Sequence, residues 1–325
     1  MSESSPLKFD CLCAGIMVAD HICAPISRLP QAGELIMTDR LSLTSGGCAS
    51  NVAVDLARVG RRVGVIGRVG QDVFGEFVSR ELSQAGVDTT HVLETPGVDT
   101  SGTLIVNVRG EDRRFIHAVG ANASFDGHEV TPELIRNTKM LYLGGFCLMP
   151  SLTGESAARM FRIAREAGVP TVLDVVISDS QSGWEQLTAV LPFTDVFLPN
   201  SDEALHLTGV TDPFEQADRF CAAGAKTVVI TCGRTGAVLV SGEQRLRSGA
   251  FAVEFIDGTG SGDAFAAGFI HGLLQQKPLR DCLEIGSALG ASCVRHAGAT
   301  AGVFNPPELE AFLQQQRLPV EVLGG

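Results

Sequence analysis

The chain has 325 residues, of which 45% are hydrophobic and 19% charged, so it can bury a substantial core. Its formal net charge of −12 argues against nucleic acid and anionic membrane surfaces as partners, although local dipoles and Mg²⁺ can still hold a nucleotide. The nine cysteines form no C-x-x-C pair, no apolar run approaches a membrane span, and the N-terminus lacks a signal-peptide pattern. We therefore expect free thiols, no membrane partner and a cytoplasmic location.

Short apolar runs alternate with amphipathic segments along most of the chain. The runs that we expect to form buried strands are residues 11–18, 62–67, 140–143, 171–175, 196–198 and 227–231. The segments that we expect to form helices are residues 51–58, 76–85, 154–167, 182–191, 214–223, 262–274 and 279–296. Strands that are apolar on both faces and separated by helices are typical of a parallel sheet covered on both sides. The sequence therefore predicts an α/β fold.

Two stretches interrupt this alternation. Residues 35–44 and 103–118 have strand-like patterning, and the second contains the turn signal Arg109-Gly110-Glu111-Asp112. They predict a small antiparallel sheet inserted into the α/β body, as a lid over the active site, a subunit interface or both. We expect residues 1–325 to form a single domain with lid segments near 35–44 and 100–120. A homodimer through the lid would cover its apolar face.

The string Asp257-Gly258-Thr259-Gly260-Ser261-Gly262-Asp263-Ala264-Phe265 is the strongest chemical signal in the chain. Its glycines let the N–H groups of Gly260, Ser261 and Gly262 converge at a helix start, whose partial positive charge favours an anion. Such an anion hole suits a transferring phosphoryl group, and Asp263 beside it can accept a proton from an attacking hydroxyl. The alternative is an ordinary capped helix start, which the complete string disfavours.

A second string, Gly46-Gly47-Cys48-Ala49-Ser50-Asn51, also leads from a glycine turn into a helix. Glycines permit the close approach of a ligand, and the Asn51 amide offers both a donor and an acceptor to a sugar hydroxyl. A plain turn with an Asn or Ser helix cap explains this string equally well, so it does not decide the function by itself.

In the chain, the string at Gly46 precedes the string at Asp257 by about two hundred residues. In this order, the two strings resemble the paired signatures of the PfkB/ribokinase family of carbohydrate kinases. Further matches extend from the first strand to the last helices: Ala19-Asp20-His21, Gly67-Arg68-Val69-Gly70-Gln71-Asp72 (G-x-x-G-x-D), Asn200-Ser201-Asp202-Glu203 (N-x-x-E) and Thr231-Cys232-Gly233-Arg234-Thr235-Gly236 (T-x-G-x-x-G). The resemblance implies a ribokinase-like three-layer α/β/α sandwich, with a central mostly parallel sheet and a small inserted β-sheet lid. It also implies a kinase that transfers the γ-phosphoryl group of ATP to a hydroxymethyl group of a small sugar, such as ribose, fructose or 2-keto-3-deoxygluconate.

The same resemblance implies roles for individual residues. The sugar would be held by Asp20, Gly46, Gly47, Asn51 and, through the string Gly120-Ala121-Asn122, by Asn122. Mg²⁺ would be positioned through water by Asn200 and Glu203, and the nucleotide site would be lined by Thr231, Gly233 and Gly236. The anion hole would consist of Gly260, Ser261 and Gly262, with Asp263 as the base. A monovalent cation such as K⁺ could bind Asp257, Thr259 and carbonyls near residues 296–300.

Some positions depart from the family's usual strings or allow two interpretations. Ser261 stands where alanine is usual, which matters little because the anion hole uses a backbone N–H. Cys48-Ala49-Ser50 stands where ribokinases often carry Lys-Gly-Ala, which weakens an assignment as ribokinase itself. Asp174 ends a predicted strand and could either tune the Mg²⁺ region or simply start the next loop. Arg113 and Arg114 could pair with an acid sugar if the lid closes, or lie on the hairpin surface.

Three other functions are alternatives to a sugar kinase. A dinucleotide-dependent oxidoreductase is disfavoured because no G-x-G-x-x-G string follows the first strand. A non-catalytic sugar or nucleotide sensor on the same fold would have no use for Asp263. A nucleoside kinase of the same family stays open, because the 17 phenylalanines are spread too widely to indicate or exclude a slot for a base.

Overall fold

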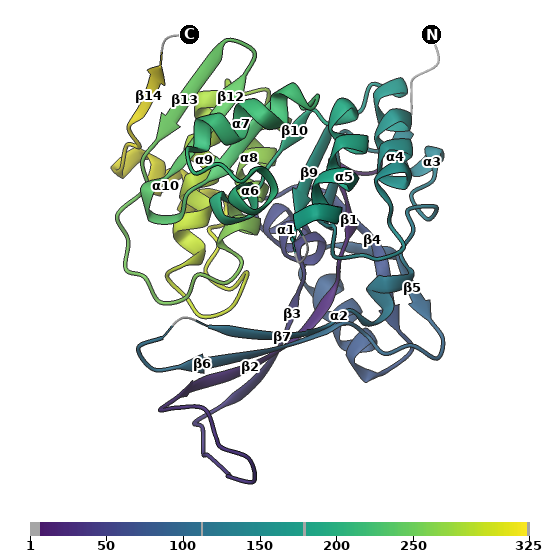
Figure 1. The fold of residues 1–325 in the computed structure, drawn as a ribbon, viewed down its shortest axis with the longest axis vertical. Coiled ribbons are helices and arrows are strands. Elements are labelled where there is room, and N and C mark those ends of the chain that lie inside the picture. The colour runs from purple at the N-terminus through teal and green to yellow at the C-terminus, as the bar shows by residue number, and fades with distance from the viewer. Residues whose placement is uncertain (1–6, 112, 178–179, 324–325) are drawn as a thin grey trace.

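A computed structural model of the chain describes residues 7–111, 113–177 and 180–323. Its body is built on a ten-stranded sheet with the order β14-β13-β12-β11-β10-β9-β8-β1-β4-β5 (Figure 1). The strands are β1 (Cys11–Gly15), β4 (Val63–Gly70), β5 (Asp88–Thr95), β8 (Leu141–Phe146), β9 (Thr171–Val175), β10 (Val196–Phe197), β11 (Thr227–Thr231), β12 (Ala237–Ser241), β13 (Gln244–Ser248) and β14 (Val320–Leu323).

Most of this sheet is parallel, as the alternation of strands and helices predicts. From β5 to β11 each strand runs parallel to its neighbour, whereas β12, β13 and β14 extend the sheet with antiparallel pairs. Sequence analysis did not identify these last strands. They belong to a hairpin that turns at Gly242, where φ is +57°, and to a short C-terminal edge strand.

Helices cover both faces of the sheet because the buried strands are apolar on both. In β1, Cys11 and Cys13 belong to one hydrophobic core, and Leu12 and Ala14 belong to the other. The helices are α1 (Cys48–Arg58), α2 (Val73–Gln84), α3 (Pro132–Arg136), α4 (Gly154–Glu166), α5 (Ser180–Val190), α6 (Ser201–Thr208), α7 (Pro213–Ala222), α8 (Ser261–Leu274), α9 (Leu279–Cys293) and α10 (Pro306–Gln315). Helices α1, α2, α8, α9 and α10 contribute to the first core, and α3 to α7 contribute to the second. The result is the expected three-layer α/β/α sandwich.

A second, four-stranded sheet projects from the body, and we call it the lid (Figure 1). Its strands, in spatial order, are β3 (Leu41–Gly46), β2 (Val18–Ile26), β6 (Gly102–Val108) and β7 (Arg114–Ala118). The small separate sheet is therefore confirmed, but three details of the prediction are wrong. Its centre is β2, most of which was not predicted as a strand, and β2 pairs parallel with β6. The predicted strand at 35–44 begins only at Leu41, because residues 35–40 of the connection between β2 and β3 have no neighbouring strand to pair with.

The two faces of the lid differ in character. Pairing across the sheet places Leu43, His21, Leu104 and Ile116 in one row, so they share the outer face. The neighbouring position in β2 is Asp20, which therefore shares the opposite, inner face with its partner Thr103. The inner face also carries Ile22 and Ile105, so its hydrogen-bonding groups gather at the end that bears Asp20. Within the described ranges, no helix is long and apolar enough to cross a bilayer.

Candidate active site

The start of α8 presents N–H groups to which an anion can bind, but they are not the full set predicted from the sequence. Gly260 adopts φ +76°, and a Cβ there would lie 2.3 Å from the Ala299 carbonyl oxygen, so only glycine fits. The N–H of Ser261 makes a long turn hydrogen bond of 3.3 Å to Gly258. Among the described residues, the N–H groups of Gly262 and Asp263 have no backbone acceptor. Both are thus available to an anion, and no atom lies within 4 Å of the position that a Gly262 Cβ would occupy.

The two glycine strings meet at Asp263. Helices α1 and α8 pack together, and Asn51 Nδ2 donates a hydrogen bond of 2.8 Å to Asp263 Oδ2. Burial raises the pKa of Asp263, and hydrogen bonds from Asn51 and Cys48 act in the opposite direction. Asp263 therefore lies between the predicted sugar residue Asn51 and the anion hole, which is where a base for phosphoryl transfer must be.

A cluster of acidic side chains surrounds Asp263, and sequence analysis identified it only in part. Cys48 Sγ and one carboxylate oxygen each of Asp174 and Asp263 lie within 4.8 Å of one another. Tyr142 Oη, fully buried on β8, donates a hydrogen bond of 3.2 Å to Asp174 Oδ2. Burial raises the pKa of Asp174, and the negative charge of Asp263 raises it further. Asp174 thus belongs to the site, and the only signal in the sequence was its place at the end of a parallel strand.

The N-x-x-E motif forms the start of α6 and has a structural role there. The Asn200 side chain accepts hydrogen bonds of 2.9 Å from the N–H groups of Asp202 and Glu203, and Glu203 Oε2 accepts one from the N–H of Asn200. Burial raises the pKa of Glu203, and the charges of Asp174 and Asp263 add to this effect. Glu203 thus faces the same acidic cluster from the opposite helix layer.

Asp20 approaches the site from the inner face of the lid. It is 8% exposed, and burial raises its pKa to about 6, with a further contribution from the charge of Asp263. A hydrogen bond with Thr103 acts in the opposite direction, and Thr103 Oγ1 lies 3.0 Å from His117 Nδ1. The sequence pattern places Thr103 and His117 in a lid strand and does not indicate that they share a hydrogen bond. Together these residues give the inner face several hydrogen-bonding groups that suit sugar hydroxyls.

The glycines of the second string are required by close contacts. A Cβ on Gly46 would lie 1.9 Å from Asp20 Oδ2, and one on Gly47 would lie 2.5 Å from the Ile16 carbonyl oxygen. Gly47 also has φ +90°, which other residues rarely adopt. Both glycines therefore allow the lid strand that bears Asp20 to pass directly beside the start of α1.

Asn122 is almost fully buried, and its amide binds the backbone. Its Oδ1 accepts a hydrogen bond of 3.2 Å from the N–H of Met17, and its Nδ2 donates one of 2.9 Å to the Met17 carbonyl. This geometry favours a role in fixing the chain just before β2. Direct contact of Asn122 with the sugar stays a prediction.

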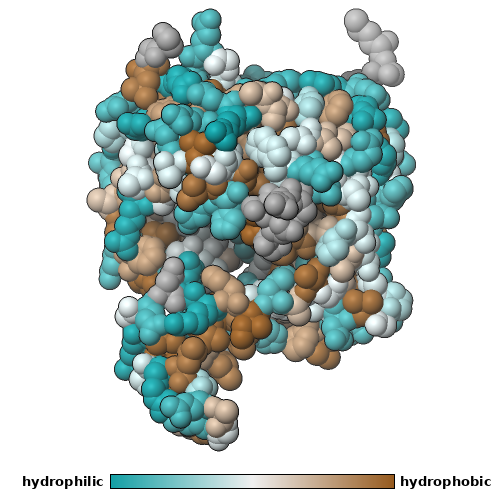
Figure 2. Space-filling model, in the orientation of Figure 1, coloured by the Kyte–Doolittle hydropathy of each residue, from teal (hydrophilic) through white to brown (hydrophobic). Residues whose placement is uncertain are grey.

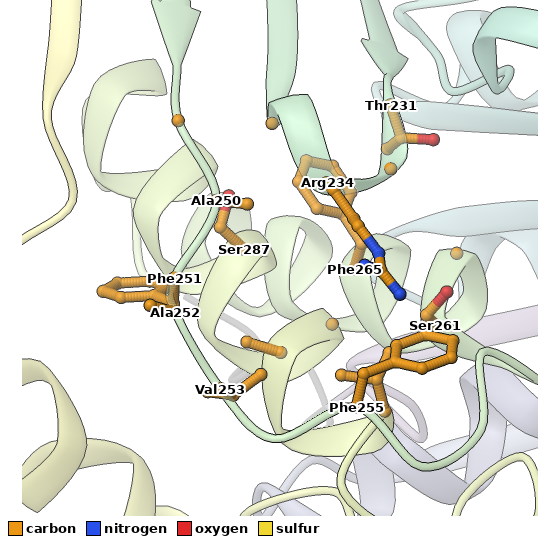
Figure 3. A pocket seen from close by; sticks show the side chains of 17 residues that line it. Thr231, Arg234, Ala250, Phe251, Ala252, Val253, Phe255, Ser261, Phe265 and Ser287 are labelled. Atoms are coloured by element: carbon orange, nitrogen blue, oxygen red, sulfur yellow. The ribbon is translucent and has the colours of Figure 1, made fainter.

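A cavity of about 460 Å³ opens on the other side of the anion hole (Figure 3). Its polar lining includes the predicted residues Thr231, Gly233, Gly236, Ser261 and Gly262. Its walls are largely apolar and include Phe251, Val253, Phe255, Phe265, Ala291 and Val294. An apolar slot beside a helix start suits a nucleotide, because the slot can hold the base and the helix start the phosphates.

Arg234 is a residue of this cavity that the motif matches did not single out. Its guanidinium carbon lies 4.9 Å from the centre of the Phe255 ring, and Figure 3 shows the side chain extending toward Ser261. A cation in this position can attract the phosphates of a nucleotide.

Asp257 and Thr259, the expected ligands of a monovalent cation, lie in the loop before α8. Asp257 Oδ1 accepts hydrogen bonds of 3.0 Å from the Thr259 N–H and 2.8 Å from its hydroxyl. Arg113, from the loop between β6 and β7, also donates to both side chains. The structure therefore brings a lid residue to this loop, a contact that sequence analysis did not anticipate.

Comparisons with known proteins identify the family of this chain. The profile of the pfkB family of carbohydrate kinases matches residues 8–305. The chain is 30% identical over 314 residues to a ribokinase of Haemophilus influenzae, covering 92% of this chain and 97% of the relative. It is 26% identical over 288 residues to a 5-dehydro-2-deoxygluconokinase of Clostridium botulinum, covering 84% of each. The solved structure of an Arabidopsis thaliana ribokinase complexed with ribose and ATP matches with a TM-score of 0.81 and 25% identity, covering 94% of this chain and 99% of that one.

These matches confirm the resemblance that the motifs indicated. They extend over nearly the whole chain, the fold is ribokinase-like, and the relatives are named as kinases. Because the family profile spans residues 8–305 and the two glycine strings meet at a single carboxylate, this protein is an enzyme of the pfkB family of carbohydrate kinases.

Proposed function

We propose that this enzyme transfers the γ-phosphoryl group of ATP to a hydroxymethyl group of a small, uncharged sugar. The proposal rests on the position of Asp263. Its carboxylate bonds to Asn51 on the side of the sugar residues, and the start of its helix lines the nucleotide cavity. A sugar hydroxyl and a γ-phosphate that approach from these two sides would meet at the anion hole.

The transfer follows from what each group at the start of α8 can do. Asp263 accepts the proton of the sugar hydroxyl as the hydroxyl oxygen bonds to the γ-phosphorus, and the bond from that phosphorus to the bridging oxygen of ADP breaks. The N–H groups of Gly262 and Asp263 stabilise the negative charge on the transferred group. Burial supports the reaction, because the raised pKa of Asp263 makes its carboxylate a better proton acceptor.

The acidic cluster fits a hard divalent cation such as Mg²⁺ bound together with ATP. Asp174 and Glu203 offer carboxylate oxygens, and their raised pKa values reflect burial and repulsion that a cation would relieve. Glu203 and Asp174 would hold such an ion through water, and the ion would supply positive charge beside the phosphates.

The charges around the site support an uncharged acceptor. Asp20, Asp174 and Asp263 would repel a sugar carboxylate. The two cations considered for an acid sugar both contact acidic partners, since Arg113 pairs with Asp257 and Arg114 pairs with Glu111. A pentose or ketohexose such as ribose or fructose is therefore our proposed substrate class.

A sugar panel tests the proposal, with ADP release measured in a coupled assay. We expect the highest kcat/KM for a neutral pentose or ketohexose in the presence of Mg²⁺ and ATP. A preference for 2-keto-3-deoxygluconate would contradict the uncharged acceptor but keep the sugar kinase, and a preference for adenosine would indicate a nucleoside kinase. A rate of ADP release that is the same with and without every acceptor tested would contradict the whole proposal. Asp263→Asn serves as the inactive control.

We also propose that the enzyme is a homodimer whose two lids cover each other. The outer face of the lid exposes Leu41, Leu104 and Ile116 by 73%, 42% and 65%, and Figure 2 shows a hydrophobic patch on this part of the molecule. An apolar sheet face of this kind is normally covered, and a second copy of the same face can do so. Light scattering measures the mass directly. Ile116→Lys should shift a dimer toward monomers, and a wild-type monomer at working concentration would refute the proposal.

A further inference from the structure

An arginine of the lid, Arg113, contacts the anion-hole loop. Arg113 Nη1 lies 2.9 Å from Asp257 Oδ1 and also donates to Thr259 Oγ1. Arg113 leads into β7 on the lid, whereas Asp257 and Thr259 lie just before α8 on the body. The side chains of Arg113 and Asp257 are only 25% and 17% exposed, so their ion pair is better shielded from water than most surface pairs.

Asp257 organises the loop that forms the anion hole. One oxygen, Oδ1, accepts from the N–H and the hydroxyl of Thr259, and the other, Oδ2, accepts from the N–H of Gly298 at 3.0 Å. Gly260 follows directly and packs against Ala299, next to Gly298. The Asp257 carboxylate therefore links the loop at Thr259 to the segment at Gly298, and Gly260 is held between them. Gly260 immediately precedes the N–H groups that would face the phosphoryl group.

This carboxylate keeps its charge although it is partly buried. Burial works to raise the pKa of Asp257, but hydrogen bonds from Gly298 and Thr259, together with the Arg113 charge, hold it below its usual value. A charged carboxylate close to a transferring phosphoryl group needs a compensating cation. Arg113 supplies that positive charge from the lid.

The arrangement does not fit a monovalent cation at Asp257 Oδ1. A K⁺ ion would need free oxygen ligands there, yet this oxygen already accepts three hydrogen bonds, one of them from the guanidinium. The Thr259 hydroxyl is likewise used by Arg113 and Asp257. With the lid in this position, the guanidinium takes the place that the ion would occupy.

We propose that Arg113 is a positioning residue that clasps the closed lid to the anion-hole loop and makes a monovalent cation unnecessary. Closing the lid over the sugar would bring the guanidinium to Asp257 and fix the loop in its active geometry. Sugar binding would then be coupled to assembly of the anion hole, so that ATP alone would meet an incompletely ordered loop. This inference rests on the proposed phosphoryl transfer.

The kinetic test compares Arg113→Ala with Arg114→Ala, a neighbouring lid arginine that pairs with Glu111 instead. We expect Arg113→Ala to lower kcat by about 10²-fold, with a much smaller change in sugar KM, because the anion hole acts on the transition state. Arg113→Lys should keep part of the activity, and low concentrations of guanidinium or K⁺ should partly restore Arg113→Ala. Arg114→Ala should remain close to wild type.

Two results would overturn the proposal: a kcat for Arg113→Ala within about twofold of wild type, or a wild-type enzyme that loses most of its activity when K⁺ is replaced by tetramethylammonium. A readout without turnover separates this proposal from the proposed reaction. Hydrogen exchange of residues 257–263 should be faster in Arg113→Ala than in Arg114→Ala, with sugar bound in both. Equal exchange in the two variants would refute the clasp even if the kinase assay succeeds, and matching melting temperatures would show that both variants are folded.

Discussion

Asp257 and Asp263 lie close together in the chain, one before α8 and one in its first turn. Their surroundings nevertheless shift their pKa values in opposite directions. Burial acts to raise the pKa of both carboxylates. Around Asp257, N–H groups, a hydroxyl and Arg113 outweigh burial, so the pKa is lowered. Asp263 faces the acidic cluster instead, and its pKa stays raised. The comparison teaches that a carboxylate with several hydrogen-bond donors and a cation beside it stabilises a loop. A buried carboxylate with fewer donors and no cation beside it is better suited to accept a proton.

The sharpest test of this contrast is Asp263→Asn. Asparagine keeps the size of the side chain and can still accept the bond from Asn51, but it cannot take the hydroxyl proton. Loss of a general base typically costs about 10² to 10⁴ in rate, so kcat should fall by that factor while calorimetric affinities for sugar and an ATP analogue change little. Asp281→Asn, in the first turn of α9, is a matched control outside the site. A variant that keeps more than about a tenth of kcat would place the base elsewhere.

The lid carboxylate should affect binding more than turnover. Hydrogen bonds to charged groups contribute about 1.5–3 kcal/mol each, so Asp20→Ala should raise the sugar KM tenfold or more. The KM for ATP should stay unchanged, because Asp20 lies on the lid and not in the nucleotide cavity. Asp39→Ala, at an exposed position between β2 and β3, provides the control. If the KM for ATP rose and that for the sugar did not, the assignment of Asp20 would be wrong.

Glu203 should act more weakly, through the metal requirement. Glutamine can still accept the hydrogen bond from the Asn200 N–H, so Glu203→Gln keeps the helix cap and removes only the charge. We expect the Mg²⁺ concentration for half-maximal activity to rise about tenfold, the lower end of the loss typical for a group that holds a metal through water. The sugar KM should not move, and Asp202→Asn next to it should behave as wild type. Full wild-type activity in EDTA would refute a role for the ion.

The smallest effect concerns stability and pH in the absence of ligands. The raised pKa values of Asp174 and Glu203, about 7 and about 8, leave the folded protein with more bound protons than the unfolded chain above about pH 6.5. Below that pH, His91, His117 and His271 act in the opposite direction, because their pKa values are lowered. Stability should therefore fall as the pH rises from about 6.5 to about 8, and the melting temperature should drop by a few degrees. Asp174→Asn should flatten this slope. A melting temperature that rises over the same range would contradict the charge repulsion.

The short glycine strings predicted those parts of the site that are formed by residues close together in the sequence. The glycines before α8 and α1 need particular backbone conformations, which leave a direct mark in the sequence, as the φ of +76° at Gly260 illustrates. The buried strands were also evident, because a strand packed on both faces is apolar throughout.

Contacts between distant segments left no such mark. Cys48, Asp174 and Asp263 come from α1, β9 and α8, and only the order of strands in the sheet brings them together. Arg113 was expected either on the hairpin surface or beside an acid sugar, and neither alternative included Asp257, which lies on the body and far away in the sequence. β2 was missed because Asp20, His21 and Pro25 interrupt an otherwise apolar run, so it does not look like a buried strand.

The chain crosses between body and lid at points that lie beside one another. Gly47 passes directly against Ile16, Asn122 binds Met17, and a Cβ on Gly120 would lie 2.7 Å from the N–H of Ser101. A rotation of the lid at these crossings would move Asp20 away from the body. Arg113 lies farther along the lid than Asp20, so the same rotation would separate it from Asp257 by a larger distance. One joint would thus open the sugar site and loosen the phosphate site in a single movement.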